Sequence, residues 1–269
     1  MMKKRGFLQN KNNTCQFIGC LHLLPLPGSP QWGGTLQPVI EQCLREADTY
    51  MSHAADGLLI ENTHDVPYLK AEAEAGTVAA MAAVATTVRK HYPATPIGIQ
   101  VLAAADIAAL DIAIACDLDF IRAEGFSYAH VADEGIIEGN AGRILRRRSH
   151  LNANHIEIFT DIKKKHAAHS ITGDLSLLEF AKGVLFCNAD GIIVTGNTTG
   201  EPPELGSLKE VSGLDMRLAV GSGVTMENID SFAQVADLLI VGSACKVDGD
   251  WRNEVDPQRV EDLIQRFKS

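Results

Sequence analysis

Six ionisable side chains stand at or just beyond the ends of predicted strands, where they could perform acid–base or electrostatic chemistry. A carboxylate in a closed pocket can have its pKa raised into the range of general acid–base catalysis. A nearby lysine or arginine can hold an anion or stabilise an enolate. We therefore predict a catalytic group drawn from His22, Glu61, Arg122, Asp161, Lys165 and His166.

The carboxylates and the arginine also have a structural interpretation. Glu61 and Asp161 could form salt bridges or loop caps at the rim of the fold. Arg122 could contact a substrate, or it could form an internal ion pair with Glu61 or Glu124. The residue types alone leave both interpretations open.

The histidines and lysines carry similar alternatives. Residues 163–165 could be a solvated run of lysines, and His22 could be a buried core histidine with its hydrogen bonds satisfied. His166 and His169 have the i, i+3 spacing that can bind a metal on a helix, but no third ligand is identifiable. We predict no cofactor and assign no metal ligands, with binding of a divalent metal kept as an alternative.

Two glycine-containing turns follow consecutive apolar runs near the end of the chain. Residues 218–225 read LAVGSGVT and residues 237–244 read DLLIVGSA. Glycine lets the backbone approach an anion closely, and a helix N-terminus offers unpaired N–H groups, although tight turns between packed elements would look the same. Neither a Walker A sequence nor the third glycine of a dinucleotide fingerprint is present. The residues predicted to bind phosphate are Gly196, Gly221, Ser222, Gly223, Gly242 and Ser243.

Eight β-rich runs alternate with eight helical patterns, and these elements must position the polar residues. The predicted strands are residues 17–22, 57–61, 97–101, 120–123, 155–161, 191–195, 217–221 and 237–241. The predicted helices are residues 38–53, 71–91, 105–116, 141–152, 175–187, 205–212, 226–234 and 257–268. Pro38 and Pro257 suit a first helical turn, and Asp106, Asp174 and Asp256 suit caps or first-turn acids.

The alternation predicts an α/β fold, a single (β/α)8 TIM barrel, with a large open sheet as the alternative. Several strand-to-helix connections are long, including residues 124–140 and 162–174. In a barrel these connections gather at the carboxyl ends of the strands, where barrel enzymes place their chemistry. We predict one barrel domain over residues 16–269, preceded by a flexible tail at residues 1–15.

Composition excludes several functional classes. The chain has 269 residues, 46% of them hydrophobic, and a formal net charge of −10, which does not favour a nucleic-acid partner. No apolar run approaches the ~18 residues of a membrane span, so we expect no membrane insertion. The six cysteines include no C-x-x-C pair, and we interpret them as reduced structural thiols. We expect a cytoplasmic protein, and the basic, acid-free N-terminus leaves a mitochondrial or other organellar matrix open.

At these residues the sequence resembles the BtpA family, also called BtpA/SgcQ, over nearly the whole chain after the tail. The similar stretches are residues 19–30 (GCLHLLPLPGSP), 61–62, 65–67, 77–81 (TVAAM), 120–122, 165–167, 194–196, 199–200, 220–225 (VGSGVT) and 255–257. The resemblance implies a barrel of the ribulose-phosphate-binding type. The family's namesake is associated with photosystem I biogenesis in cyanobacteria, and other members look like enzymes encoded beside sugar-metabolism genes.

The chain departs from the pattern expected of that family at three places. Lys163 stands where a histidine is expected, Gln100 stands where an asparagine is expected, and residues 102–105 (LAAA) lack the expected polar side chains. These changes put the ancestral activity in question and leave the two glycine turns intact.

The function predicted from these observations is an enzyme acting on a small phosphorylated sugar or nucleotide-like substrate, by an isomerase- or lyase-type step. The alternative is a non-catalytic assembly or biogenesis factor that uses the barrel as a scaffold. The expected partner is the phosphorylated small molecule, and a homo-oligomer stays open.

Overall fold

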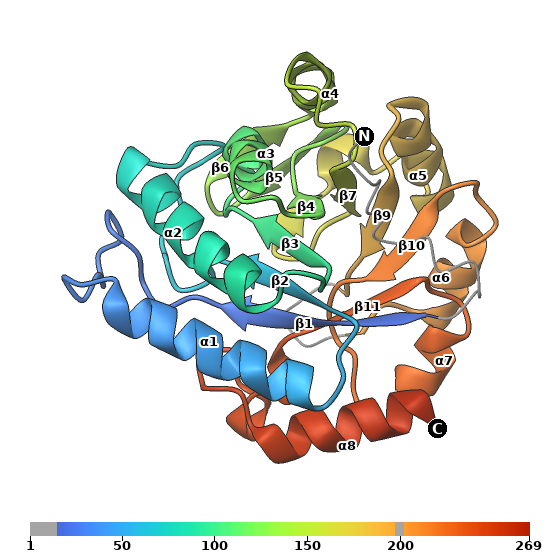
Figure 1. Ribbon diagram of the computed structural model, residues 1–269. Coiled ribbons are helices and arrows are strands. Elements are labelled where there is room, and N and C mark those ends of the chain that lie inside the picture. Colours follow the sequence, from blue (N-terminus) through green and yellow to red (C-terminus); the bar gives the residue numbers. More distant parts are fainter. Residues whose placement is uncertain (1–14, 197–201) are drawn as a thin grey trace.

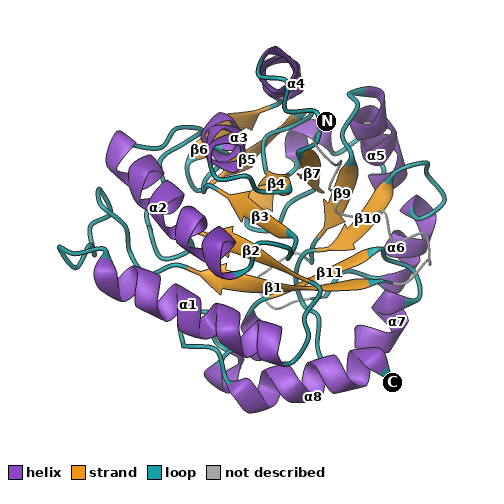
Figure 2. Cartoon of the chain, in the orientation of Figure 1, coloured by secondary structure: helices purple, strands orange, loops and turns teal. Residues whose placement is uncertain are grey.

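The eight apolar runs form the strands of one closed parallel barrel, with the helices arranged around it (Figures 1 and 2). The computed structural model describes residues 15–196 and 202–269. The strands are β1 Gln16–His22, β2 Gly57–Glu61, β3 Ile97–Gln100, β4 Phe120–Ala123, β7 Glu157–Ile162, β9 Gly191–Val194, β10 Arg217–Val220 and β11 Leu238–Val241. Around the barrel they run in the order β1-β11-β10-β9-β7-β4-β3-β2. The predicted (β/α)8 barrel is confirmed. Residues 1–14 of the predicted tail and the similar stretch 199–200 lie outside the described residues.

Eight α-helices occupy the predicted places. They are α1 Gln37–Ser52, α2 Ala75–His91, α3 Asp106–Ala115, α4 Ala141–His150, α5 Leu177–Phe186, α6 Leu205–Val211, α7 Ile229–Ala233 and α8 Pro257–Lys268. Asp256 caps α8 by accepting a hydrogen bond from the Gln258 N–H at 2.9 Å, as expected. The expectation for Asp174 was wrong, because α5 starts later with a capping box between Ser176 and Glu179.

The lower barrel interior is filled by apolar side chains that alternate along the strands. A buried cluster inside the barrel contains Ile18, Cys20, Leu59, Phe120, Phe159, Ile193, Ala219, Leu238 and Ile240. The Phe120 and Phe159 rings meet edge to face with centroids 5.8 Å apart. Gly98 makes room for one ring, because a Cβ there would lie 2.2 Å from Phe120. We call this cluster the barrel floor.

Polar side chains follow the floor residues at a spacing of two along the same strands. Side chains alternate between the two faces of a strand, so residue i+2 points into the barrel like residue i. Leu59 is thus followed by Glu61, Phe120 by Arg122 and Phe159 by Asp161. All three polar residues are buried and line a cavity above the floor. The strand pattern therefore carries the predicted chemistry to one end of the barrel.

A second sheet lies on this side of the barrel, within the two long connections at residues 124–140 and 162–174. Its strands are β5 Ala129–Ala132, β6 Gly135–Glu138 and β8 Ala167–Ala168, paired antiparallel in the order β6-β5-β8. Gly135 allows the hairpin turn with a φ of 101°. Because β8 contains the residues between His166 and His169, these two histidines do not lie on a helix.

All six cysteines lie in the described part of the chain and carry free thiols. Within residues 15–196 and 202–269, no helix combines the length and the apolar character needed to cross a membrane.

Candidate functional site

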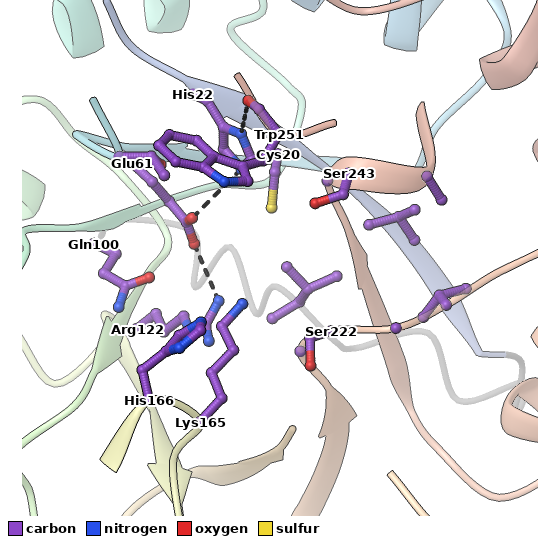
Figure 3. Close-up of a pocket in the computed structure, with 18 of the residues that line it drawn as sticks. Cys20, His22, Glu61, Gln100, Arg122, Lys165, His166, Ser222, Ser243 and Trp251 are labelled. Atoms are coloured by element: carbon purple, nitrogen blue, oxygen red, sulfur yellow. Dashed lines mark hydrogen bonds and ion pairs between the residues drawn. The ribbon is translucent and has the colours of Figure 1, made fainter. Parts of the chain in front are cut away.

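A cavity of about 900 Å³ opens at the carboxyl ends of the barrel strands. Figure 3 shows Ser222 and Ser243 on one side of it, opposite Glu61, Gln100 and Arg122. The lining contains the six predicted catalytic residues and five of the six predicted phosphate residues: His22, Glu61, Arg122, Asp161, Lys165, His166, Gly221, Ser222, Gly223, Gly242 and Ser243. The structure thus brings together residues that are up to 221 positions apart, His22 and Ser243.

The centre of the site is a buried ion-pair network around Arg122. Its Nε and Nη2 atoms donate to the two carboxylate oxygens of Asp161, each at 2.9 Å, and Nη1 donates to Glu61 Oε1 at 3.1 Å. Such a bidentate, charge-assisted pair fixes the guanidinium plane. The internal ion pair considered for Arg122 is therefore present with Glu61 and Asp161, whereas Glu124 pairs with Lys164 at 3.0 Å instead.

Glu61 and His22 face each other next to this network. Burial raises the pKa of Glu61, and the positive charge of Arg122 opposes that rise. Burial and the charge of Lys246 lower the pKa of His22 to about 3, so its ring is neutral at neutral pH. The His22 Nδ1 atom lies 3.3 Å from the Trp251 carbonyl oxygen, and its Nε2 atom lies 3.8 Å from Glu61 Oε2. His22 is thus buried and hydrogen-bonded, as the structural interpretation held, and it also borders the cavity.

The lysine run separates into three directions rather than forming one solvated face. The Lys163 ammonium donates to the Leu175 carbonyl and does not belong to the cavity lining, while Lys164 and Lys165 both line the cavity. Burial and the neighbouring Arg122 lower the pKa of Lys165. Figure 3 shows the Lys165 amine pointing into the cavity beside Arg122. His166 is largely exposed at the rim, and its partial burial and the charge of Lys165 lower its pKa.

The two glycine turns close the opposite side of the cavity. The first turn is braced by Asn228, which accepts from the Thr225 N–H and donates to the Gly223 carbonyl, each at 2.8 Å. A φ of +69° explains the glycine at position 223. A Cβ on Gly221 would lie 3.4 Å from Arg122 Nη2, so this turn runs beside the guanidinium.

Two features next to the glycine turns were not evident from the sequence. After β11 the chain enters a single 3-10 turn, η2 Ser243–Cys245, rather than a helix. Gly196 was predicted to bind phosphate, but it is not part of the cavity lining. Its N–H donates to the Ser222 hydroxyl at 3.1 Å, so it joins the connections that follow β9 and β10.

Sequence reasoning missed a group of residues that support His22 from the last barrel connection. Lys246 is completely buried, and its ammonium lies 2.7 Å from Glu46 Oε1 on α1. The same carboxylate oxygen accepts from the Val255 N–H at 3.3 Å. These contacts hold both ends of residues 246–255, and Trp251 within this segment accepts the His22 hydrogen bond. No local sequence signal identifies these contacts, because they join positions about 200 residues apart.

One further group could hold a metal ion. Across the described residues, the only three histidine, cysteine or acidic side chains with ligand atoms within 4.8 Å of one another are Cys20, His22 and Glu61. All three are buried and line the cavity. Cys20 is one of the six cysteines interpreted above as structural thiols, although its i, i+2 spacing from His22 on one strand indicates that both side chains point in the same direction.

Comparison with protein families gives one match over most of the chain. The sequence model described as BtpA family matches residues 13–269. A mitochondrial protein of Caenorhabditis elegans is 44% identical over 257 residues, covering 94% of this chain and 92% of that protein. The photosystem I biogenesis protein BtpA of Synechocystis is 35% identical over 253 residues, covering 92% of this chain and 86% of that protein.

Solved structures with the same fold have far lower sequence identity. The thiamine phosphate pyrophosphorylase of Pyrococcus furiosus has a TM-score of 0.57 at 12% identity, with 96% of each chain covered. A 3-hexulose-6-phosphate synthase has a TM-score of 0.57 at 15% identity, covering 93% of this chain and 99% of that chain. At these identities the likeness shows the TIM-barrel fold alone.

Proposed function

This chain belongs to the BtpA family, and from that premise we propose that its barrel mouth binds a small phosphorylated sugar or nucleotide-like compound and converts it by an isomerase- or lyase-type reaction. One observation carries the proposal. Two glycine turns face a buried Glu61–Arg122–Asp161 network across a single cavity. An anion-accepting backbone thus stands opposite groups suited to proton transfer.

The phosphate group is assigned to the two glycine turns. Backbone N–H groups of residues 222–223 and 242–243 donate hydrogen bonds to the phosphate oxygens, whereas the Gly221 N–H already donates to the Val194 carbonyl at 2.9 Å. Arg122 lies beside the first turn and supplies positive charge on that side of the cavity. The net charge of −10 gives the protein no general attraction for anions, so these local groups must supply the affinity for phosphate.

The reacting carbon is assigned to the space between Glu61 and Lys165. Glu61, whose pKa is raised by burial, removes the proton from a hydroxyl-bearing carbon next to a carbonyl group and returns it to the former carbonyl carbon. The hydroxyl proton passes to the former carbonyl oxygen, so the carbonyl and hydroxyl groups exchange places. Lys165 and Arg122 stabilise the enolate oxygen that carries the charge between these two steps. Asp161 orients Arg122 through both carboxylate oxygens, and His166 stands at the rim where substrate enters.

The comparisons support a phosphorylated ligand without identifying it. The names of the two fold neighbours described above both include a phosphorylated compound. A binding test therefore uses ribulose 5-phosphate, with ribulose and inorganic phosphate as reference compounds. We expect ribulose 5-phosphate to raise the melting temperature and ribulose to leave it unchanged. The proposal fails if neither a panel of sugar phosphates nor inorganic phosphate binds in calorimetry.

A pair of variants tests the position of the phosphate. Ser243→Glu places a carboxylate in the second turn and is expected to remove the melting-temperature shift by repulsion. Ser212→Glu makes the same change at the end of α6, where the chain leads into the amino end of β10, and is expected to keep the shift. Gly221 is a poor test position, because a Cβ there would lie 2.3 Å from Ile193 Cγ2 and disturb the fold. Equal loss in both serine variants would contradict the assignment.

A second candidate function is a non-catalytic assembly or biogenesis factor. The observation that favours it is a set of exposed apolar side chains near the second sheet, with Val131, Ile136 and Ile171 exposed at 44%, 53% and 61%. The name of the Synechocystis relative supports the same candidate. Loss of function in cells in Val131→Ser/Ile136→Ser, with sugar-phosphate binding intact, would favour it over the enzyme. Full function of that variant would remove its support.

We also propose a compartment and leave the assembly state to measurement. The cytoplasm is our proposal, with a mitochondrial or other organellar matrix as the alternative, which the name of the Caenorhabditis elegans relative supports. Imaging of the full chain with a C-terminal tag distinguishes the two. Light scattering after size exclusion tests whether the chain forms a homo-oligomer.

A further inference from the structure

Three potential metal ligands converge at the wall of the cavity formed by β1 and β2. Cys20 and His22 are two positions apart on β1, so both side chains point into the barrel. Glu61 is the direct register partner of His22 on β2. The Cys20 Sγ atom, a His22 ring nitrogen and a Glu61 oxygen all lie within 4.8 Å of one another. We propose that Cys20, His22 and Glu61 bind a divalent transition-metal ion, with Zn²⁺ the best match to this ligand set.

The hydrogen bond of His22 prepares its other nitrogen for a metal. The Trp251 carbonyl can only accept, so the Nδ1 atom at 3.3 Å from it carries the proton. The Nε2 atom of the neutral ring then presents a lone pair toward Glu61. Metal-binding histidines commonly donate their second ring N–H to a carbonyl or carboxylate in this way, which fixes the ring orientation.

The space between His22 and Glu61 has the size of a shared ion. His22 Nε2 and Glu61 Oε2 are separated by 3.8 Å, too far for a hydrogen bond, and both present lone pairs. Zinc binds nitrogen and carboxylate oxygen at about 2.0–2.2 Å, so a tetrahedral site places these two atoms roughly 3.4 Å apart. A contraction of a few tenths of an ångström reaches that distance. A cation between the two atoms removes the repulsion of facing lone pairs.

The charges around the site set the conditions for binding. Arg122 and Lys165 oppose a nearby cation, but both oxygens of Asp161 already engage Arg122. Glu61 uses Oε1 for Arg122 and keeps Oε2 for the ion. A Cys20 thiolate adds a second negative ligand. Sulfur and imidazole ligands favour Zn²⁺ and related ions over Mg²⁺ or Ca²⁺, which prefer a shell of oxygens.

The ion would lie next to the second glycine turn. A Cβ on Gly242 would be 3.0 Å from His22 Nε2 and 3.4 Å from the Cys20 Cβ. Three protein ligands leave a coordination position for a substrate oxygen, which is the arrangement of catalytic rather than structural zinc sites. Binding of the ion does not depend on the reaction assigned above. With the ion bound, both Glu61 oxygens are engaged, so the proton transfer assigned to Glu61 above belongs to the metal-free protein.

Metal loading of the purified full chain tests the site. The protein is stripped with a chelator, dialysed against Zn²⁺ or Co²⁺, and measured for metal content by mass spectrometry. We expect about one ion per chain and a thiolate-to-cobalt charge-transfer band in the near ultraviolet. Cys20→Ser is expected to remove the band and to weaken zinc binding roughly tenfold or more. Cys187→Ser changes a free cysteine on the outside of the barrel and is expected to keep both.

Two outcomes would overturn the site. One is wild-type protein that retains no stoichiometric zinc and shows no cobalt band. The other is a band that survives in Cys20→Ser or disappears equally in Cys187→Ser. His22→Gln provides an independent check, because it should shift the visible cobalt spectrum while circular dichroism of the metal-free protein shows the fold intact. Zinc binding without sugar-phosphate binding would refute the proposed function and keep the metal site, and the reverse result would do the opposite.

Discussion

Replacing Lys246 by methionine is expected to destabilise the barrel strongly. The Lys246 side chain is completely buried, and its ammonium lies 2.7 Å from Glu46 Oε1. At an effective dielectric constant of about 20, this attraction is roughly 6 kcal/mol, and desolvation of the two groups offsets much of it. Removing Lys246 leaves the Glu46 carboxylate desolvated and without its attractive partner. In buried pairs such a loss lowers the free energy of unfolding by about 3–5 kcal/mol. At roughly 2–4 °C per kcal/mol, the melting temperature falls by about 6–20 °C.

The loss should depend on pH with a defined sign. Burial raises the pKa of Glu46, and Lys246 holds that rise back. Without the lysine, the pKa of the folded-state carboxyl rises further above its unfolded value of about 4.3. A raised carboxyl pKa leaves stability intact below the unfolded pKa and removes it as pH rises through the folded pKa. The free energy of unfolding of Lys246→Met should therefore be close to that of the wild type near pH 4 and far below it at pH 7.

Urea unfolding followed by circular dichroism at both pH values measures this effect. Glu46→Gln/Lys246→Met is expected to recover much of the stability, because no charge stays buried. Lys209→Met, at an exposed position on α6, is the matched control and should change stability little. A loss below about 1 kcal/mol at pH 7, or a double variant no more stable than Lys246→Met, would refute the reasoning.

Three further changes test the floor and the mouth of the barrel. Gly98→Ala should destabilise the protein by about 1–3 kcal/mol, since its Cβ would meet the Phe120 ring at 2.2 Å, and Phe120→Leu should rescue it in urea unfolding. Glu61→Gln should lower turnover of a sugar-phosphate substrate by about 10²–10⁴-fold while circular dichroism shows the fold retained, and near-wild-type turnover would remove Glu61 from proton transfer. In the wild type, turnover should fall as pH drops through the raised pKa of Glu61, because the protonated carboxyl cannot act as a base. Asp161→Asn removes a negative charge that raises this pKa, so the acid side of the pH–rate profile should move to lower pH.

The strands and their inward-pointing ends could be predicted because their signals are local. Runs such as residues 57–61 and 120–123 were predicted with the bounds that the structure shows. Each run ends at the barrel mouth, so the position of Glu61 and Arg122 at or next to the end of a strand is enough to place them there. The same reasoning fails where the backbone leaves a regular pattern. Ala71, with a φ of +57°, cannot begin the helix predicted over residues 71–91.

Contacts between distant segments could not be predicted from one sequence. The hydrogen bond from His22 to Trp251 spans 229 residues, and the Lys246 to Glu46 pair spans 200. Neither segment alone indicates its partner, because any buried cation needs an anion without specifying which one. The second sheet was missed for another reason, since β5 and β6 are only partly buried and lack the continuous buried run of the barrel strands, and β8 has only two residues.

On three barrel strands a floor residue is followed two positions later by a polar residue that lines the cavity. Packing constrains the first position, and the contents of the cavity constrain the second. Phe120 packs in the barrel floor, whereas Arg122, two residues further along the strand, lines the cavity to which we assign the chemistry. A lineage can therefore change the upper layer one strand at a time while the lower layer keeps the barrel closed. Gln100 occupies such an upper position above the floor contact at Gly98. Related barrels should consequently differ in substrate long before they differ in architecture.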